Sequence, residues 1–541
     1  MTAFGKLTDY NDVLGYDLPQ TLERSVKLVP DKVALINGDE RITYKQLDER
    51  VDALAASLQS LGIGKGDRVA IDLVNCPELL VAYFAVAKLG AVVTWTNPLY
   101  RAEEFKFQVS NSGSKAVIIH KEFGGFDYLG MLRSMRSELP DLKHVIALGG
   151  GAERDVIDFD ELVKKGWGQR CRRPEIDPKN DLVMLLYTGG TTGIPKGAMQ
   201  THQNSILSSA IGIPLMDITA DDVFLALLPL FHTFGVSVVA NIALMSQGTI
   251  VLFPEYKPEL TLQLVEAHKI TIHHAAPTHV LLETSHPNFG KYNLSSLRTG
   301  LAAGAAWPVE LFHRAEDMMG LHLSHAWGMA EIGGIGTACK TGDPNRNTSI
   351  GKPLVPGARA RVVDPETGKD VPPGVPGELL FAGNILQGYW GRPDETAKAI
   401  DKDGFLHTGD LVTVDEQGYL RVTSRIKEVI KKGGYSINPN EIEALLCQHP
   451  RIKEACVIST PNPVLGESIC ACVVTRDGQP LSLKEVRDFM KDKIAAFKVP
   501  DELANFPDFP RLAGGVKLRK FGPGSIQEMA TADEKRERLR R

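Results

Sequence analysis

The chain contains one glycine- and threonine-rich run, residues 187–197, directly after a strand-like apolar segment, residues 182–187. The run holds four glycines, three threonines and one lysine. Glycine lets the backbone turn sharply and brings its N–H groups close to a ligand, while threonine hydroxyls add donors and the lysine adds a positive charge. It is not a Walker A loop, in which the lysine precedes Ser or Thr, because Lys196 precedes Gly197. A surface turn is the alternative interpretation. Taken together, the eleven positions favour a loop that binds a polyphosphate.

Length, charge and cysteine usage narrow the class of protein. A chain of 541 residues exceeds one hydrophobic core, so several domains are expected. The net charge of −5 predicts neither a nucleic-acid partner nor an anionic membrane surface. Seven mostly scattered cysteines indicate reduced thiols in the cytoplasm. Cys470 and Cys472 could share one strand face, but no second pair completes a metal site, so core packing is favoured.

Two segments resemble membrane or targeting elements only superficially. Residues 1–19 carry polar and acidic positions without an apolar core, so they do not read as a signal peptide. Residues 223–253 form the most apolar run, but Pro229, His232, Gly235, Asn241 and Gln247 interrupt it. We therefore expect buried elements and no integral membrane span.

Strand and helix patterns alternate along the first part of the chain. Thr43 and Gln46 form a predicted capping box before a helical apolar repeat, and the alternation continues to residue 120. Such alternation predicts parallel sheet covered by helices. We further expect a linker at 160–178, a helix at 201–211 and strands at 226–230, 249–253 and 270–275.

The composition and the secondary-structure pattern change in the last third of the chain. Residues 351–423 are rich in glycine and proline with short strands, and the pattern after Arg425 is α+β. The predicted fold class is α/β, with a large N-terminal domain (1–425) of two doubly wound αβ subdomains plus the β-rich subdomain. A small α+β C-terminal domain (426–541) follows.

Five further stretches carry candidate site chemistry. They are small residues at 302–308, an aromatic and a carboxylate (Trp327 and Glu331) at 326–331, His-Thr-Gly-Asp at 407–410, Arg-Ile-Lys-Glu at 425–428 and a basic, glycine-led run at 514–520. Alone each is weak, since a tryptophan is more often core and a glutamate more often solvated.

In this order the stretches resemble the adenylate-forming superfamily, which includes acyl-CoA synthetases, 4-coumarate–CoA ligases, luciferases and adenylation domains. The resemblance covers residues 43–520. The Tyr-Thr-Gly-Gly-Thr-Thr-Gly form at 187–193, followed by Thr-His-Gln-Asn at 201–204, is most similar to bacterial fatty-acyl-CoA synthetases.

The resemblance implies a two-step reaction that uses ATP, Mg²⁺ and coenzyme A. A carboxylic acid attacks the α-phosphorus and releases pyrophosphate, and a thiol then attacks the acyl-adenylate and releases AMP. Bringing two anions together demands cations and N–H donors around the phosphates. The implied partners are therefore an acid, ATP and CoA or an amine, and a homodimer is compatible with the sequence.

The resemblance also assigns residues. The implied catalytic residues are Lys517, Glu331, Lys196 and His232, and Glu331 is the implied Mg²⁺ ligand. The small C-terminal domain is implied to rotate about Lys427 and to line a CoA tunnel with Lys431, Gly433 and Gly434. The ATP and AMP contacts are Thr188, Gly189, Gly190, Thr191, Thr192, Gly193, Lys196, Gly304, Ala305, Ala306, Ala326, Trp327, Gly328, Met329, Ala330, Asp410 and Arg425. The acyl pocket is His232, Gly235, Ala276, Gly328 and Gly333.

Three positions depart from the family pattern. Ala330 stands where a threonine usually precedes the metal glutamate, and His325 replaces the usual Gln or Asn. The expected C-terminal lysine position holds Val516, so a one-residue insertion makes Lys517 the catalytic candidate, with Lys520 as the weaker substitute.

Three functions stay open at this point. An acid–CoA ligase for a hydrophobic acid leads, because residues 332–336 are apolar and glycine-bearing. An amide synthetase and a non-catalytic nucleotide-binding relative are the alternatives. A metal at His273, His274 and His279 is not favoured, because adjacent strand residues face opposite ways.

Overall fold

The computed structural model describes residues 10–151, 155–188, 195–304, 307–432, 435–462, 465–491, 493–494, 496–511, 518–522, 524–532 and 536–538. The chain divides into two compact units. Met1–Arg359 with Phe381–Leu406 form the first, and Ala360–Leu380 with His407–Arg541 form the second.

A seven-stranded sheet organises the N-terminal part of the first unit. Its order is β11-β10-β4-β3-β5-β8-β9, and every neighbouring pair is parallel except β10 and β11. The strands are β3 (Arg68–Asp72), β4 (Val92–Trp95), β5 (Ala116–His120), β8 (His144–Leu148), β9 (Ile157–Asp158), β10 (Leu182–Thr188) and β11 (Lys196–Thr201). The sheet thus follows the predicted doubly wound pattern.

Helices cover this sheet, and their starts follow local rules. The predicted capping box of α2 is present, since the Gln46 amide donates to Thr43 Oγ1 (3.2 Å) and the Thr43 amide donates to Gln46 Oε1 (2.9 Å). Every residue of α3 except the half-buried Glu78 is buried, as expected of a helix that is apolar on nearly all sides. The elements are α1 (Leu18–Leu28), α2 (Tyr44–Ser60), α3 (Pro77–Lys88), α4 (Ala102–Ser112), α5 (Tyr128–Met135), α6 (Phe159–Gly166) and the hairpin β6 (Glu122–Phe123) and β7 (Phe126–Asp127).

The second sheet system consists of two four-stranded sheets joined through one residue. Ile272 forms parallel bridges to Phe224 and to Thr299, and so links β12-β13-β1-β2 with β14-β15-β16-β17. The strands are β1 (Val33–Asn37), β2 (Glu40–Thr43), β12 (Val223–Leu225), β13 (Thr249–Leu252), β14 (Thr299–Ala302), β15 (His322–Met329), β16 (Gly334–Ala338) and β17 (Lys352–Pro353).

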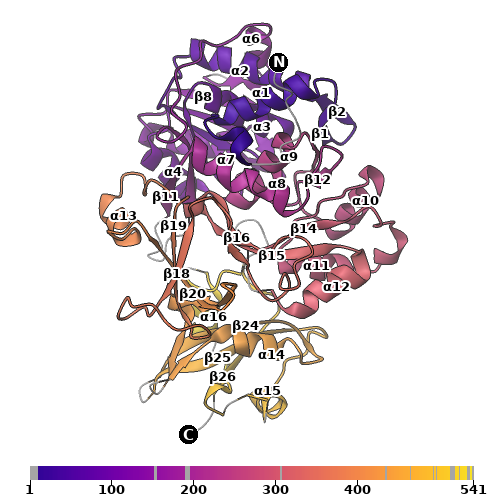
Figure 1. The fold of residues 1–541 in the computed structure, drawn as a ribbon, viewed down its shortest axis with the longest axis vertical. Helices are drawn as coiled ribbons and strands as arrows, with labels where there is room; N and C mark the ends of the chain where they lie inside the picture. Colours follow the sequence, from indigo (N-terminus) through magenta and orange to yellow (C-terminus); the bar gives the residue numbers. More distant parts are fainter. Residues whose placement is uncertain are drawn as a thin grey trace. The chain divides into compact units, whose positions relative to one another are not determined.

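Helices also flank this second system. Figure 1 shows α11 and α12 lying beside β14 and β15, and the same helices are in contact with each other. The elements are α7 (His202–Ala210), α8 (Gly212–Leu215), the π-helix η3 (Phe234–Asn241), α9 (Ile242–Met245), α10 (Pro258–His268), α11 (Pro277–Thr284), α12 (Val309–Met319), the 3₁₀ turn η5 (Ala330–Ile332) and α13 (Pro393–Ala399).

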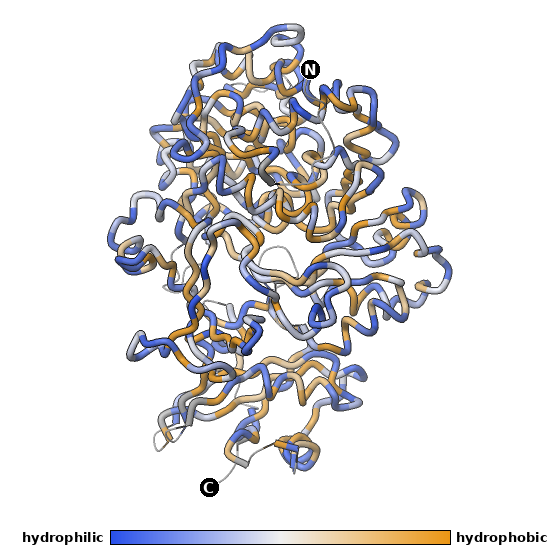
Figure 2. Tube along the Cα trace, in the orientation of Figure 1, coloured by the Kyte–Doolittle hydropathy of each residue, from blue (hydrophilic) through white to orange (hydrophobic). Residues whose placement is uncertain are grey.

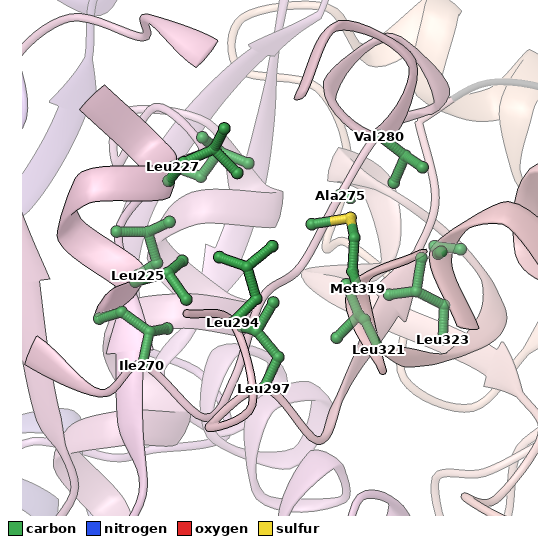
Figure 3. Packing of buried hydrophobic residues seen from close by; sticks show 14 of the residues in the cluster. Leu225, Leu227, Ile270, Ala275, Val280, Leu294, Leu297, Met319, Leu321 and Leu323 are labelled. Carbon is green, nitrogen blue, oxygen red and sulfur yellow. The ribbon is translucent and has the colours of Figure 1, made fainter. Parts of the chain in front are cut away.

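The core of this region is a continuous apolar cluster. Leu225 of β12, Leu294 and Leu297 of the turn at 294–297, Met319 of α12 and Leu323 of β15 belong to this cluster (Figure 3). Figure 2 shows apolar residues along these inner segments and polar residues on the outer loops. Burial of this surface contributes about 25 cal/mol per Å² and fixes the strand ends that carry the candidate site.

The second unit contains two sheets. The first, β18-β19-β20-β21, is the predicted β-rich region, and the second has the order β23-β22-β25-β26-β27 with β24 paired to β25. The elements are β18 (Arg359–Val363), β19 (Gly377–Ala382), β20 (Leu406–Val414), β21 (Leu420–Arg425), η6 (Ile426–Glu428), β22 (Ile430–Lys432), β23 (Tyr435–Ile437), α14 (Pro439–Leu446), β24 (Ile452–Asn462), β25 (Gly466–Thr475), α15 (Leu483–Met490), β26 (Glu502–Phe506), α16 (Ile526–Ala532) and β27 (Glu537–Arg538). Cys470 and Cys472 pack in a core cluster with Cys456, as predicted.

The predicted fold class is confirmed, and several local predictions are wrong. Part of the expected linker at 160–178 is helix α6, because Asp158 accepts from the Glu161 amide and caps it. The strand expected at 226–230 lies earlier, as β12, and the one at 270–275 is reduced to bridges at Ile272 and Ala275. The division into units groups most of the β-rich region with the C-terminal part. A moving domain that begins at residue 426 stays a prediction.

Candidate active site

The lysine of the predicted phosphate loop lies at the end of a hairpin. Thr188 and Lys196 are cross-strand partners at the ends of β10 and β11, and residues 189–194 between them lie outside the described residues. Because β10 and β11 pair in antiparallel fashion, Thr188 and Lys196 lie side by side at the base of the loop. The placement of Gly189, Gly190, Thr191, Thr192 and Gly193 stays a prediction.

The predicted metal ligand lies close to this hairpin. Glu331 belongs to η5, which packs against both β10 and β11. The Gln200 side chain donates to the Ala330 carbonyl (2.6 Å), and the Leu386 amide donates to the Glu331 carbonyl (2.6 Å). Glu331 is 6 % exposed. The fold thus brings together Lys196 and Glu331, which are 135 positions apart (331 − 196).

Two residues that the sequence left unassigned complete this cluster. The Tyr389 hydroxyl donates to Glu331 Oε1 (2.9 Å), and Lys196 Nζ lies 5.2 Å from the centre of the Tyr389 ring. Lys196 Nζ also pairs with Glu395 Oε2 at 2.5 Å. The Gly-Tyr-Trp run at 388–390 was the available sequence signal for Tyr389, and nothing in the local pattern of α13 marks Glu395.

The predicted adenine platform is only partly open. Gly304 has φ +86°, and a Cβ added to it would meet nothing within 4 Å, which suits the close approach of a flat ring. Trp327 is 8 % exposed and packs against Phe381, with ring centres 5.6 Å apart. Ala326, Met329 and Ala330 follow on β15 and η5. Ala305 and Ala306 lie outside the described residues. Burial lowers the pKa of His325 to about 4, so this ring is neutral at pH 7.

The glycines of the predicted acyl pocket have a packing role. A Cβ on Gly235 would stand 2.0 Å from the Pro229 carbonyl oxygen, and one on Gly328 would stand 1.9 Å from the Gly334 carbonyl oxygen. Gly333 has φ +73°, and its Cβ would approach Gln200 Oε1 at 3.0 Å. These glycines therefore permit close backbone approach and do not by themselves indicate room for an acyl chain.

The remaining pocket candidates differ in exposure. His232 is exposed in the turn before η3, and its Nδ1 accepts from the Phe234 amide (3.2 Å). Ala276 is 4 % exposed at the start of α11, where its amide donates to His279 Nδ1 (3.1 Å). A π-helix such as η3 is frequent at functional sites. A pocket role for these residues stays a prediction.

The histidine cluster beside this region is an internal structural network. His273 Nε2 lies 3.0 Å from Glu283 Oε2, and both side chains are fully buried. His274 Nδ1 accepts from the Leu301 amide (3.0 Å). Burial lowers the pKa of both His274 and His279 to about 3. Within the described part of the chain, no group of three or more His, Cys, Asp or Glu could hold a metal ion.

The second unit carries the predicted ribose and hinge residues. Asp410 on β20 and Arg425 on β21 are cross-strand partners, with Arg425 Nε 3.0 Å from Asp410 Oδ1. Asp410 is 5 % exposed. Lys427 lies in η6 directly after β21, where burial and then Arg425 lower its pKa. The order strand, short 3₁₀ turn, new sheet suits a hinge position.

The C-terminal candidates are only partly described. Lys520 Nζ pairs with Glu443 (2.9 Å) and Glu428 (3.5 Å). Burial alone would lower the pKa of Lys520, but these carboxylates raise it. Lys520 is therefore engaged in a structural cluster and is a poor substitute for the catalytic lysine. Lys517, Gly433, Gly434 and the Lys431 side chain lie outside the described residues.

The residues of the first unit fit a magnesium polyphosphate. Glu331 supplies a hard carboxylate ligand whose Oε1 is already oriented by a hydrogen bond, and Lys196 supplies an ammonium group at the base of the loop. Phosphate oxygens and water would complete the coordination of Mg²⁺. No described helix is long and apolar enough to cross a membrane.

Comparison with known proteins gives consistent matches along the chain. Residues 22–390 match the model of the AMP-binding enzyme family, and residues 441–515 match that of the AMP-binding enzyme C-terminal domain. A long-chain-fatty-acid–CoA ligase of Bacillus subtilis is 32 % identical over 95 % of this chain and 96 % of its own. 4-Coumarate–CoA ligase 5 of Oryza sativa subsp. japonica is 32 % identical over 91 % of each chain.

A solved structure shows the same architecture. The anthranilate CoA ligase AuaEII in complex with anthranoyl-AMP has a TM-score of 0.86 and 27 % identity, covering 94 % of this chain and 97 % of its own.

Proposed function

Because the chain belongs to the AMP-binding enzyme family and is an AMP-forming acid–CoA ligase, we propose that it activates a hydrophobic carboxylic acid, whether fatty, cyclic or aromatic. The observation that carries the proposal is the convergence of Lys196 and Glu331 on one edge of the seven-stranded sheet. The relatives are named for a long-chain fatty acid, 4-coumarate and anthranilate, and these acids support this range.

In the first step, a carboxylate oxygen attacks the α-phosphorus, and the bond to the bridging oxygen breaks to release pyrophosphate. Lys196 would bind the departing phosphates, and its ammonium group would offset negative charge that grows on them. Glu331 would hold Mg²⁺, which when bound neutralises phosphate charge. The exposed His232 would stand near the acid carboxylate, and Lys517 would supply a second cation.

In the second step, the thiol of CoA attacks the acyl carbon, the carbon–oxygen bond to AMP breaks, and the thiol loses its proton. Asp410 would accept from the ribose hydroxyls while Arg425 fixes its carboxylate. Rotation at Lys427 would exchange Lys517 for the tunnel formed by Lys431, Gly433 and Gly434 between the two steps.

We place the enzyme in the cytoplasm. None of the seven cysteines, all of which lie in the described part of the chain, forms a disulfide, and four of them are buried. Reduced thiols are typical of a reducing compartment.

A pyrophosphate-release screen tests the proposal. Fatty, aromatic and cyclic acids are offered with MgATP, and each reaction is run with CoA, with an amine and with neither acceptor. We expect acid-dependent pyrophosphate release and an acyl-CoA product. If a product forms only with the amine, the activity is that of an amide synthetase. If the protein binds nucleotide but releases no pyrophosphate with any acid of the panel, it is a non-catalytic relative.

A further inference from the structure

One short segment, residues 386–390, contacts both β11, which begins with Lys196, and Glu331. Residues 386–390 run alongside β11, and backbone hydrogen bonds join them to β11 and to Glu331. The bonds join the Leu386 amide to the Glu331 carbonyl (2.6 Å), the Gln387 amide to the Met199 carbonyl (3.1 Å), the Met199 amide to the Gly388 carbonyl (3.0 Å) and the Trp390 amide to the Gly197 carbonyl (2.8 Å). The position of Tyr389 relative to Lys196 and Glu331 is therefore set by backbone pairing.

The Tyr389 side chain acts on both groups at once. Its hydroxyl donates to Glu331 Oε1 (2.9 Å), which fixes one of the two carboxylate oxygens. The face of its ring lies 5.2 Å from the Lys196 ammonium, within range of a cation–π interaction. A phenol hydroxyl keeps its proton at neutral pH and so can donate to the carboxylate.

Helix α13 holds the third member of the cluster. The Tyr389 amide donates to Thr396 Oγ1 (2.9 Å), which ties the start of α13 to the segment. Gly388 has φ +138°, and a Cβ there would meet the Thr396 side chain at 2.8 Å, so this approach requires glycine. Glu395, one residue before Thr396, pairs with Lys196, whose side chain is 15 % exposed against 27 % for Glu395.

We propose that Tyr389 is a positioning residue that fixes Glu331 relative to Lys196, and that Glu395 is the counter-ion which Lys196 exchanges for polyphosphate. The inference rests on the proposed roles of Lys196 and Glu331. An ammonium that is mostly withdrawn from water needs an anion beside it. Glu395 supplies that anion before nucleotide arrives, and its carboxylate then competes with the phosphates for Lys196.

Two variants separate the roles. Tyr389→Phe keeps the ring against Lys196 and removes only the hydroxyl. We expect the Mg²⁺ concentration that gives half-maximal pyrophosphate release to rise, with kcat lowered by about tenfold, as for outer-shell partners of metal ligands. Metal-free ATP binding should change little, because the ring that faces Lys196 is unchanged. The matched control is Tyr128→Phe, whose hydroxyl donates to the Pro98 carbonyl (3.0 Å).

Glu395→Gln keeps the shape of the side chain and removes its charge. We expect the Kd of MgATP, measured by calorimetry without acid, to fall by about fivefold or less, the range of a partly exposed ion pair. Lys398→Ala is the control, because Lys398 lies 3.8 Å from the same carboxylate but is 75 % exposed, and its loss should leave the Kd unchanged.

The outcomes are distinguishable. Weaker or unchanged MgATP binding by Glu395→Gln overturns the counter-ion exchange, and an unchanged Mg²⁺ requirement in Tyr389→Phe overturns the positioning role. If the unmodified protein binds no MgATP, the proposed function fails together with the inference. If the unmodified protein binds MgATP and both variants behave as it does, the inference is refuted while the proposed function stands.

Discussion

At the scale of single residues, His273 and Glu283 form a fully buried ionisable pair outside the candidate active site. Burial alone lowers the pKa of His273, but the Glu283 carboxylate outweighs burial and the net shift is upward. A raised pKa means that this group stabilises the fold fully below the unfolded-state pKa, about 6.5, and that the contribution is lost as the pH rises through the folded-state value.

The variant Glu283→Gln tests this pair. We expect the free energy of unfolding to fall by about 3 kcal/mol at pH 6, since removing one partner strands a buried charge, and the deficit to shrink at pH 9. Urea denaturation followed by fluorescence at both pH values measures it. Glu310→Gln, an exposed carboxylate on α12, is the control. A deficit that is the same at both pH values would mean that His273 stays neutral in the fold.

At the scale of elements, glycines decide how closely β15, β16 and η3 approach their neighbours. Gly328 and Gly235 lie where a Cβ would overlap a carbonyl oxygen of a neighbouring segment. The family resemblance assigns both glycines to the acyl pocket, and that role stays a prediction. The structure shows that each glycine lets a backbone carbonyl six positions away come close, from Pro229 to Gly235 and from Gly334 to Gly328.

Gly235→Ala should destabilise the protein. The added methyl would sit 2.0 Å from the Pro229 carbonyl oxygen, so the backbone must move, at a cost of about 1–3 kcal/mol. A thermal melt followed by circular dichroism measures the loss. Gly290→Ala is the matched control, because nothing lies within 4 Å of its added carbon. Equal melting temperatures for the two variants would refute the packing role of Gly235.

At the scale of the whole molecule, the two reaction steps are predicted to need two arrangements of the C-terminal part about Lys427. Proline fixes φ near −65° and removes the backbone N–H. We expect Lys427→Pro to retain acid-dependent pyrophosphate release but to lose acyl-CoA formation by about 100-fold, the effect of about 3 kcal/mol on a barrier. Each step is assayed separately, with Lys427→Ala as the control. Equal losses in both steps would argue against a hinge at this position.

The predicted catalytic lysine, Lys517, lies in the C-terminal part of the chain. Lys517→Ala should lose acid-dependent pyrophosphate release by about 100-fold or more, because a cation that offsets transition-state charge is removed. Conversion of preformed acyl-adenylate to acyl-CoA should persist. Lys520→Ala should instead lower the melting temperature, because it leaves Glu428 and Glu443 without their cation. Wild-type pyrophosphate release in Lys517→Ala would refute the role of Lys517.

The amino-acid sequence was enough to predict the fold class, the capping box of α2, the buried cysteines of β25 and the candidates Glu331 and Lys196. These follow from local periodicity and from motifs that are contiguous along the chain. The three-dimensional structure was needed to show that Glu395 pairs with Lys196, that Tyr389 contacts both Lys196 and Glu331, and that Lys520 pairs with Glu443. Those contacts connect residues 58 to 199 positions apart, and strand pairing and burial select them where no sequence pattern marks the partners.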